Sequence, residues 1–215
     1  MAYNSNKYTV KANFKIGAGQ SWATTACDIL NDIVTLPAHG YKTGDNIGLA
    51  TTGAVPTGLV VTTAYYVIPV DANTIAFASN LANAQAGTKI NLTAVGSGVN
   101  TAYLHGNGDY HTGIILPKGT VVVNTSYKVV TTATATASTA TLAITTEGAG
   151  DIVGAAAQST TVWDSTGAVV LGIPDVATVS DYKTMTVDRE LIFTTAVSPW
   201  TAGELNLELD CIVLP

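Results

Sequence analysis

The chain has 215 residues, of which 47% are hydrophobic and only 11% are charged, against a usual charged share of about a quarter. The net charge is −6 and Arg189 is the single arginine. Binding to phosphates needs clustered Lys and Arg, so these totals exclude nucleic acid as a partner. No stretch reaches the roughly 18 apolar residues of a membrane span, and the first residues lack the apolar core of a signal peptide. We therefore expect no membrane partner and assembly in a cytoplasm.

The first predicted element is a strand over residues 8–16. Its apolar positions are Tyr8, Val10, Ala12, Phe14 and Ile16, and its polar ones are Thr9, Lys11, Asn13 and Lys15. This period of two is typical of a strand with one buried face. The glycines at 17 and 19 end it.

From about Asp32 the chain changes to short apolar runs that are separated by turn residues. The runs lie at 33–36, 46–49, 58–61, 65–70, 74–78 and 89–92. Residues 81–87 would form one short helix closed by glycine. The close spacing of the runs predicts a compact meander of strands.

The strand pattern resumes after residue 108. Strands are expected at 120–130, 132–137, 140–144, 169–171, 184–187, 190–195 and 205–214. The alanines change parity at Ser138 and Thr139, which predicts a turn or bulge there. A polar and alanine-rich stretch at 148–159 is expected to contain a helical turn. No longer helical periodicity is present, so the predicted class is all-β.

Part of the middle segment resembles a small β module that recurs in virion proteins of tailed bacteriophages, including fibre and neck-associated proteins. The residues that carry this resemblance are Pro37-Ala-His-Gly-Tyr-Lys-Thr-Gly-Asp45, followed by residues 52–59 and 64–68.

The flanking parts, residues 8–16 and 113–215, resemble small phage head-decoration or cement proteins built as a jelly-roll-like sandwich. The matching residues are Ile115-Leu-Pro-Lys-Gly119, Thr201-Ala-Gly203 and the strand at 205–214. Together the two resemblances imply three segments. Residues 1–31 hold the first strand or strands of a jelly-roll-like β-sandwich, residues 32–104 are an inserted small β domain, and residues 105–215 complete the sandwich. An insertion in a surface loop costs little loop-closure entropy.

The resemblance also implies a function, that of a non-enzymatic virion structural protein on the capsid surface. Such a protein bridges neighbouring subunits of the major capsid protein and forms a homo-oligomer, foremost a trimer, from which the inserted domain would project outward. The alternative is a tail-fibre, collar or receptor-binding module with a glycan receptor. A carbohydrate-active enzyme on a β scaffold is a third reading.

Candidate catalytic and metal-binding residues form no recognised motif. The sequence contains no Gly-x-Ser-x-Gly, His-Glu-x-x-His or Cys-x-x-Cys motif. His105, His111 and Asp109 would make a metal site only if their loop folded back; otherwise they mark a polar hinge. His39, near Asp45, is expected to make a local backbone hydrogen bond. No catalytic, cofactor-binding or metal-binding residue is therefore predicted, and no cofactor.

Other polar and aromatic groups have two interpretations each. Glu204, Glu208 and Asp210 would line a sugar cleft or, alternating with leucines, a solvated strand face. The aromatic residues would stack on sugars or anchor a core and interfaces, and these are Trp22, Trp163, Trp200, Tyr65 and Tyr66. The threonine-rich tract at 131–146 would be an adhesive array or a strand with packed alanines. In each case we favour the second interpretation.

The two cysteines, Cys27 and Cys211, lie near opposite ends of the chain. Because a cytoplasm is reducing, we expect two small buried thiols in place of a disulfide.

Overall fold

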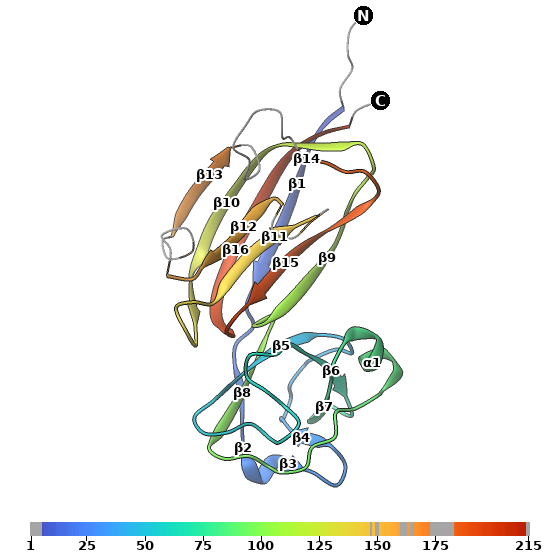
Figure 1. Cartoon of the computed structure of the whole chain (residues 1–215), viewed down its shortest axis with the longest axis vertical. Helices are drawn as coiled ribbons and strands as arrows, with labels where there is room; N and C mark the ends of the chain where they lie inside the picture. Colours follow the sequence, from blue (N-terminus) through green and yellow to red (C-terminus); the bar gives the residue numbers. More distant parts are fainter. Residues whose placement is uncertain are drawn as a thin grey trace, which may run out of the picture.

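The computed structural model describes residues 6–146, 148, 151–159, 163, 166–172 and 183–213. These residues form two lobes stacked along the long axis of the molecule (Figure 1), a β-sandwich and a smaller β unit. Both the start of the first strand and the end of the last strand lie at the end of the sandwich away from the small unit. Within the described residues, no helix is long and apolar enough to cross a membrane.

The sandwich consists of two antiparallel sheets. In the five-stranded sheet the order is β1 (Asn6–Lys15), β16 (Trp200–Val213), β10 (Thr120–Ala135) and β13 (Gly167–Gly172), with β14 (Lys183–Thr184) also pairing with β10. In the four-stranded sheet the order is β12 (Val153–Ala157), β11 (Thr141–Thr145), β15 (Arg189–Ala196) and β9 (Gly108–Leu116). The expected all-β sandwich is confirmed.

The strand pairs of the sandwich are nested. Outside the small unit, β1 pairs with β16, β9 with β15, β10 with β13, and β11 with β12. A long antiparallel ribbon that is folded over into two sheets has this nested order. The small unit lies between β1 and β9, so it enters the ribbon where the outermost pair adjoins the next.

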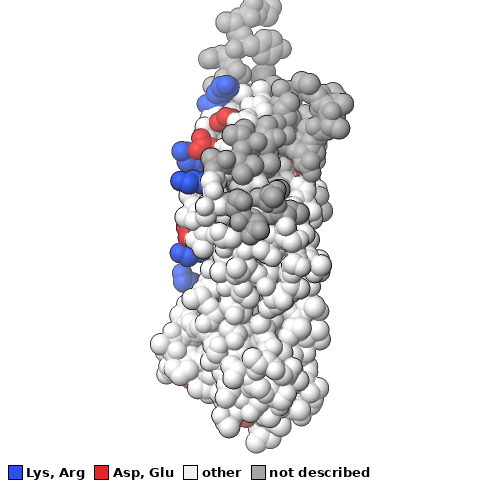
Figure 2. Space-filling model, turned by 90° about the vertical axis from the view of Figure 1, so that its left-hand side faces the viewer, with Lys and Arg blue, Asp and Glu red and all other residues white. Residues whose placement is uncertain are grey.

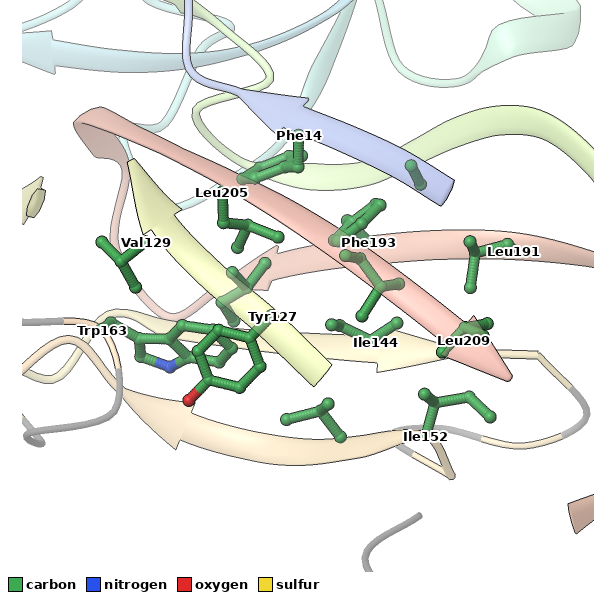
Figure 3. Packing of buried hydrophobic residues seen from close by; sticks show 14 of the residues in the cluster. Phe14, Tyr127, Val129, Ile144, Ile152, Trp163, Leu191, Phe193, Leu205 and Leu209 are labelled. Atoms are coloured by element: carbon green, nitrogen blue, oxygen red, sulfur yellow. The ribbon is translucent and has the colours of Figure 1, made fainter. Parts of the chain in front are cut away.

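The sandwich core lies between the two sheets. The inward side chains of both sheets meet there, and they include Phe14, Tyr127, Ile144, Trp163, Phe193, Leu205 and Leu209 (Figure 3). The Phe14 ring stacks on Phe193 of the opposite sheet, with centroids 5.0 Å apart and planes at 18°. Each fully buried side chain of this size contributes about 1.5–3 kcal/mol of hydrophobic stabilisation.

The small unit is built on one seven-stranded sheet. Its order is β2 (Gln20–Ala23), β8 (Val99–Leu104), β5 (Asn46–Thr51), β6 (Tyr65–Pro69), β7 (Thr74–Ala78), β4 (Ile33–Thr35) and β3 (Cys27–Asp28). A single 3-10 turn, Thr24–Ala26, joins β2 to β3, so the two edge strands of the sheet are neighbours in the chain. The sheet must therefore curl around its own core. The ring centroids of Trp22 on β2 and Phe77 on β7 are 6.1 Å apart.

The helix α1, Leu81–Ala86, confirms the expected helix. The Asn80 side chain caps its start by accepting a hydrogen bond from the Asn83 N–H at 2.8 Å. Gly87 ends it with a left-handed φ of 71°, a conformation that glycine adopts at little cost.

Several sequence predictions differ from the structure. The helical turn expected at 148–159 is wrong for the described residues, because Val153–Ala157 is strand β12 and pairs with β11. The runs at 58–61 and 89–92 are loops and not strands, and near them Thr57 and Ala94 form an isolated bridge. Residues 185–187 do not continue β14. The turn expected at Ser138 and Thr139 is confirmed.

The boundary between the two lobes also lies earlier than residue 32. Strands β2 and β3, which the sequence analysis assigned to the sandwich segment 1–31, pair with β8 and β4 of the seven-stranded sheet. The physical reason is the pairing itself, because short strands belong to the sheet that supplies their partners. Whether the small unit folds by itself stays a prediction.

Candidate functional site

The outer face of the five-stranded sheet carries a ladder of polar side chains. They project from three neighbouring strands, with Lys7, Thr9, Lys11, Asn13 and Lys15 on β1, Glu204, Asn206, Glu208 and Asp210 on β16, and Asn124, Ser126 and Lys128 on β10. We call this set the polar ladder. It holds four of the nine basic residues of the chain. A shallow hollow of about 510 Å³ lies over its middle.

The polar ladder is held together by pairs across β1 and β16. Lys11 Nζ lies 3.1 Å from Glu208 Oε2, and Lys15 Nζ lies 3.2 Å from Glu204 Oε2. The Asn13 amide donates to Asn206 Oδ1 at 2.8 Å. Hydrogen bonds from Lys15 and Asn13 hold the pKa of Glu204 below its usual value. Exposed pairs of this kind contribute little to stability because water screens them.

The three carboxylates that were candidates for a sugar cleft all belong to this ladder. Glu204, Glu208 and Asp210 project from one strand to the same side of the sheet. Cleavage of a glycosidic bond needs two carboxyl groups that flank the bond, and groups in a row on one strand do not flank it. The arrangement fits the solvated strand face.

The outer face of the four-stranded sheet is different in character. Apart from Asp109, His111 and Glu190, its outward side chains in the described strands are small or aliphatic, namely Thr141, Ala143 and Thr145 on β11, Ile192, Thr194 and Ala196 on β15, Ile115 on β9, and Ala155 and Ala157 on β12. We call this set the Thr/Ala face. In the space-filling view, blue and red side chains line one margin of the upper lobe while most of the visible surface is white (Figure 2).

Three ionisable residues lie at one edge of the Thr/Ala face, and each has a local partner. His111 Nδ1 lies 2.9 Å from Glu190 Oε2, and Glu190 Oε1 accepts the Gly113 N–H at 2.7 Å. Asp109 Oδ1 accepts the Thr194 hydroxyl at 2.7 Å. Each of these side chains therefore has a bonding partner within the chain.

The two lobes meet at a joint formed by residues 16–19 and 104–108, together with Asn46 and Trp200. Two chain segments cross between the lobes here (Figure 1). Gly17 N–H donates to Leu104 O at 2.9 Å, and Trp200 N–H donates to Gly106 O at 2.7 Å. The buried Asn46 amide of β5 donates to Asn107 O at 3.1 Å and to Asp109 O at 2.7 Å. Strands of both lobes are thus hydrogen-bonded to the same crossing segment.

Glycines let the backbones approach closely at the joint. A Cβ placed on Gly48 would lie 2.8 Å from the Gly106 carbonyl carbon, and one on Gly106 would lie 2.8 Å from Trp200 O. Real Cβ atoms do not approach other atoms so closely, so only glycine fits both positions. The joint is a packed contact and not a loose tether.

His105 lies inside the joint. Its φ is 58°, its Nδ1 is 3.1 Å from Lys15 O, and its ring centroid is 4.1 Å from that of Tyr110. Burial lowers the pKa of His105, although the bond to Lys15 O and the charge of Asp45 act in the opposite direction. His105 thus lies between the two lobes, where the sequence indicated a polar connection.

The structure does not bring His105, His111 and Asp109 together on one ligand site, since each bonds to a different partner. In the part of the chain that the structure describes, no group of three or more His, Cys, Asp or Glu side chains is placed to hold a metal. His39 accepts the Tyr41 N–H on Nδ1 at 3.0 Å and bonds through Nε2 to Asp71 O at 2.8 Å. This is the local backbone role expected of it.

The aromatic candidates for sugar stacking are core residues. Trp22, Trp163, Trp200 and Tyr65 are buried, and only Tyr66 is partly exposed. The indole N–H groups of Trp163 and Trp200 donate to backbone carbonyls at 3.0 and 3.1 Å. An exposed platform for sugars is therefore wrong for these four residues.

The threonine-rich tract and the cysteines are also explained by packing. Ala133 and Ala140 of the tract lie in the sandwich core, while the Thr134 hydroxyl bonds to that of Thr201 at 2.9 Å. Cys27 and Cys211 are free thiols, as expected, with Cys211 buried and Cys27 partly buried.

Comparisons with known proteins found little. No family model matches the chain, and no curated protein matches it. One similar solved structure is a chain of the acidic stable capsid structure of Helicobacter pylori bacteriophage KHP30, at 21% identity and a TM-score of 0.27, covering 50% of this chain and 79% of that one. Another is a chain of the cyanophage Pam1 capsid asymmetric unit, at 14% identity and a TM-score of 0.34, covering 83% and 93%. TM-scores of this size establish no common fold.

Proposed function

We propose that this chain is a non-enzymatic virion structural protein that decorates a phage capsid. It bridges neighbouring subunits of the major capsid protein as a homotrimer and stays on the capsid surface. The observation that carries the proposal is the uneven distribution of charge between the two faces of the sandwich, since the ionisable residues of the Thr/Ala face are confined to one edge. The polar ladder lies on one face, and the Thr/Ala face lies on the other.

Such a separation suits a protein held between neighbours by one face. The centre of a protein interface is depleted in charged residues, because each charge must be stripped of water on binding. On the Thr/Ala face, the described side chains away from that edge carry no charge, so burying them in an interface would desolvate no charged group. A standard interface of about 1,600 Å², repeated by symmetry over the shell, locks subunits together without chemistry. The polar ladder stays hydrated and keeps the particle soluble.

We also propose that the small unit is an insertion that projects from the shell. Its place in the nested strand order supports this, because β1, which precedes the insertion, pairs with β16 along its whole length, from Asn6 to Lys15. The close packing at Gly48 and Gly106 would hold the unit in a fixed direction.

The test is binding of the purified protein to capsid shells that lack it. Thr141→Lys and Ala155→Lys place a charge on the Thr/Ala face, and each should weaken binding at least tenfold. Ser126→Lys on the polar ladder is the matched control and should bind as the natural chain does. Equal loss in all three variants, or loss only in the control, would overturn the assignment of faces.

The second candidate is a tail-fibre, collar or receptor-binding module. Its support is the sequence from Pro37 to residue 68 in the small unit, at the opposite end of the molecule from the start of β1 and the end of β16. The burial of the tryptophans weakens it. Copy number per virion, measured by quantitative mass spectrometry, separates the two candidates. A decoration protein is present at every capsid junction, whereas a tail or collar part occurs in a few copies.

A further inference from the structure

The core of the small unit contains polar side chains without a partner. Asn100 is fully buried, at 0% exposure, and Trp22 is 3% exposed. Neither Asn100 Nδ2 nor Asn100 Oδ1 has a hydrogen-bond partner among the described residues, and the same holds for Trp22 Nε1 and Gln20 Oε1. Buried polar groups in native proteins are nearly always bonded to protein or to ordered water, so this group of atoms needs an explanation.

The strand register places these atoms on one side of one strand pair. Trp22 lies opposite Asn100, and Gln20 lies opposite Ala102. Opposite residues in an antiparallel pair have Cβ atoms about 4.5–5.5 Å apart and share a face, and residues two apart on a strand also share a face. The buried side chains of this pair, Trp22, Asn100 and Ala102, face the core. The side chains that carry the unpartnered atoms therefore lie on one face of the β2–β8 pair, where the amide nitrogen of Gln20 donates to His39 O at 2.9 Å.

The mixture of hydrogen-bond donors and acceptors among the unpartnered atoms indicates which kind of ligand they would bind. The Trp22 indole and the Asn100 amide nitrogen are donors, while Asn100 Oδ1 and Gln20 Oε1 are acceptors. A cation would be opposed by the indole N–H, and an anion by the two carbonyl oxygens. Water accepts and donates at the same site, and a buried water typically makes about three hydrogen bonds to such groups.

We propose that Trp22, Asn100 and Gln20 form a binding site for an internal water molecule. The water accepts the Trp22 N–H and an Asn100 N–H, and it donates to Gln20 Oε1 or Asn100 Oδ1. It ties β2, an edge strand of the curled sheet, to β8, which leads into the joint. The inference is independent of the proposed function.

The direct test is nuclear magnetic resonance of the whole labelled chain. Magnetisation transfer from water to the Trp22 indole proton and to the Asn100 amide protons should show the sign of a long-lived contact. The indole signal is identified by its loss in Trp22→Phe. If neither group shows a long-lived water contact, the proposal is overturned.

A second test uses the sign of a stability change. Asn100→Leu removes two bonded atoms if water is present, so the unfolding temperature should fall and the water contact of Trp22 should be lost. If the amide is truly unpaired, replacing it with an apolar group of similar size is neutral or stabilising. An unchanged or raised unfolding temperature in Asn100→Leu would contradict the proposal. If Asn100→Leu does not fold, the measurement on the natural chain decides alone.

Discussion

The side-chain amide of Asn46, in the small unit, donates a hydrogen bond of 2.7 Å to the main-chain carbonyl of Asp109, near the start of sandwich strand β9. The same amide reaches Asn107 O at 3.1 Å. One buried side chain thereby satisfies two carbonyls of the segment that links the lobes, and it does so from the other lobe.

Asn46→Ala should destabilise the chain by about 1–3 kcal/mol, because two carbonyls at the joint lose their donor. Denaturant unfolding measures this change. Asn13→Ala is the control, since Asn13 is exposed on the polar ladder, and it should change stability by less than about 0.5 kcal/mol. Equal effects would mean that the joint is already open to water.

Gly106→Ala should destabilise by about 1–3 kcal/mol through overpacking, because its Cβ would lie 2.8 Å from both Trp200 O and the Tyr103 Cβ. Gly148→Ala is the matched control, since a Cβ there meets nothing within 4 Å. Thermal unfolding of both variants checks the prediction. A fully stable Gly106→Ala variant would show that the joint can widen freely.

The stability of the folded chain should fall as the pH is lowered through the pKa of His105. Burial depresses the pKa of folded His105 below the 6.5 of the free side chain, so the unfolded chain binds the proton more readily. The contribution of His105 is therefore complete above pH 6.5 and is lost as the pH falls through the lower, folded pKa. His105→Asn keeps a residue that tolerates a left-handed φ and removes the titration.

The measurement is denaturant unfolding at several pH values between 7.5 and 5. The natural chain should lose more stability over this range than His105→Asn does. Parallel curves for the two proteins would show that His105 does not titrate differently on folding.

Native Cys211 should resist alkylation at pH 8. Burial raises the pKa of its thiol to about 11, and the thiolate is the reactive form. The partly buried Cys27 should react faster with iodoacetamide in the folded protein, and the two rates should become similar in denaturant. Mass spectrometry of labelled peptides measures both rates, and equal rates in the native protein would refute this prediction.

The local pattern of the chain was enough to predict the all-β class and most of strands β1 and β16. The alternation at residues 8–16 and 205–210 follows from strand geometry alone, since every second side chain faces the core. The longest strand, β10, was predicted as two strands, at 120–130 and 132–137, but is continuous. The short helix at 81–86 was also predictable, because Asn80 and Gly87 are capping residues that act within a few positions of the chain.

Sequence patterning failed where pairing decided the structure. Residues 154–157 are a run of Gly and Ala between Val153 and Gln158, yet pairing with β11 makes 153–157 a strand, because tertiary contacts override weak local preference. Strands β2 and β3 are too short to show a period, so only their partners β8 and β4 reveal which lobe they join.

The sequence by itself determined that the chain is β-rich, poor in charge and without a recognised catalytic motif. Only the tertiary structure decided where the few charges gather, because Lys11 and Glu208 become neighbours through the pairing of the first and last strands. It also decided that the tryptophans are core residues, and that Trp22 and Asn100 face each other across β2 and β8. Contacts between residues so distant in the chain depend on strand register, and no local period encodes that register.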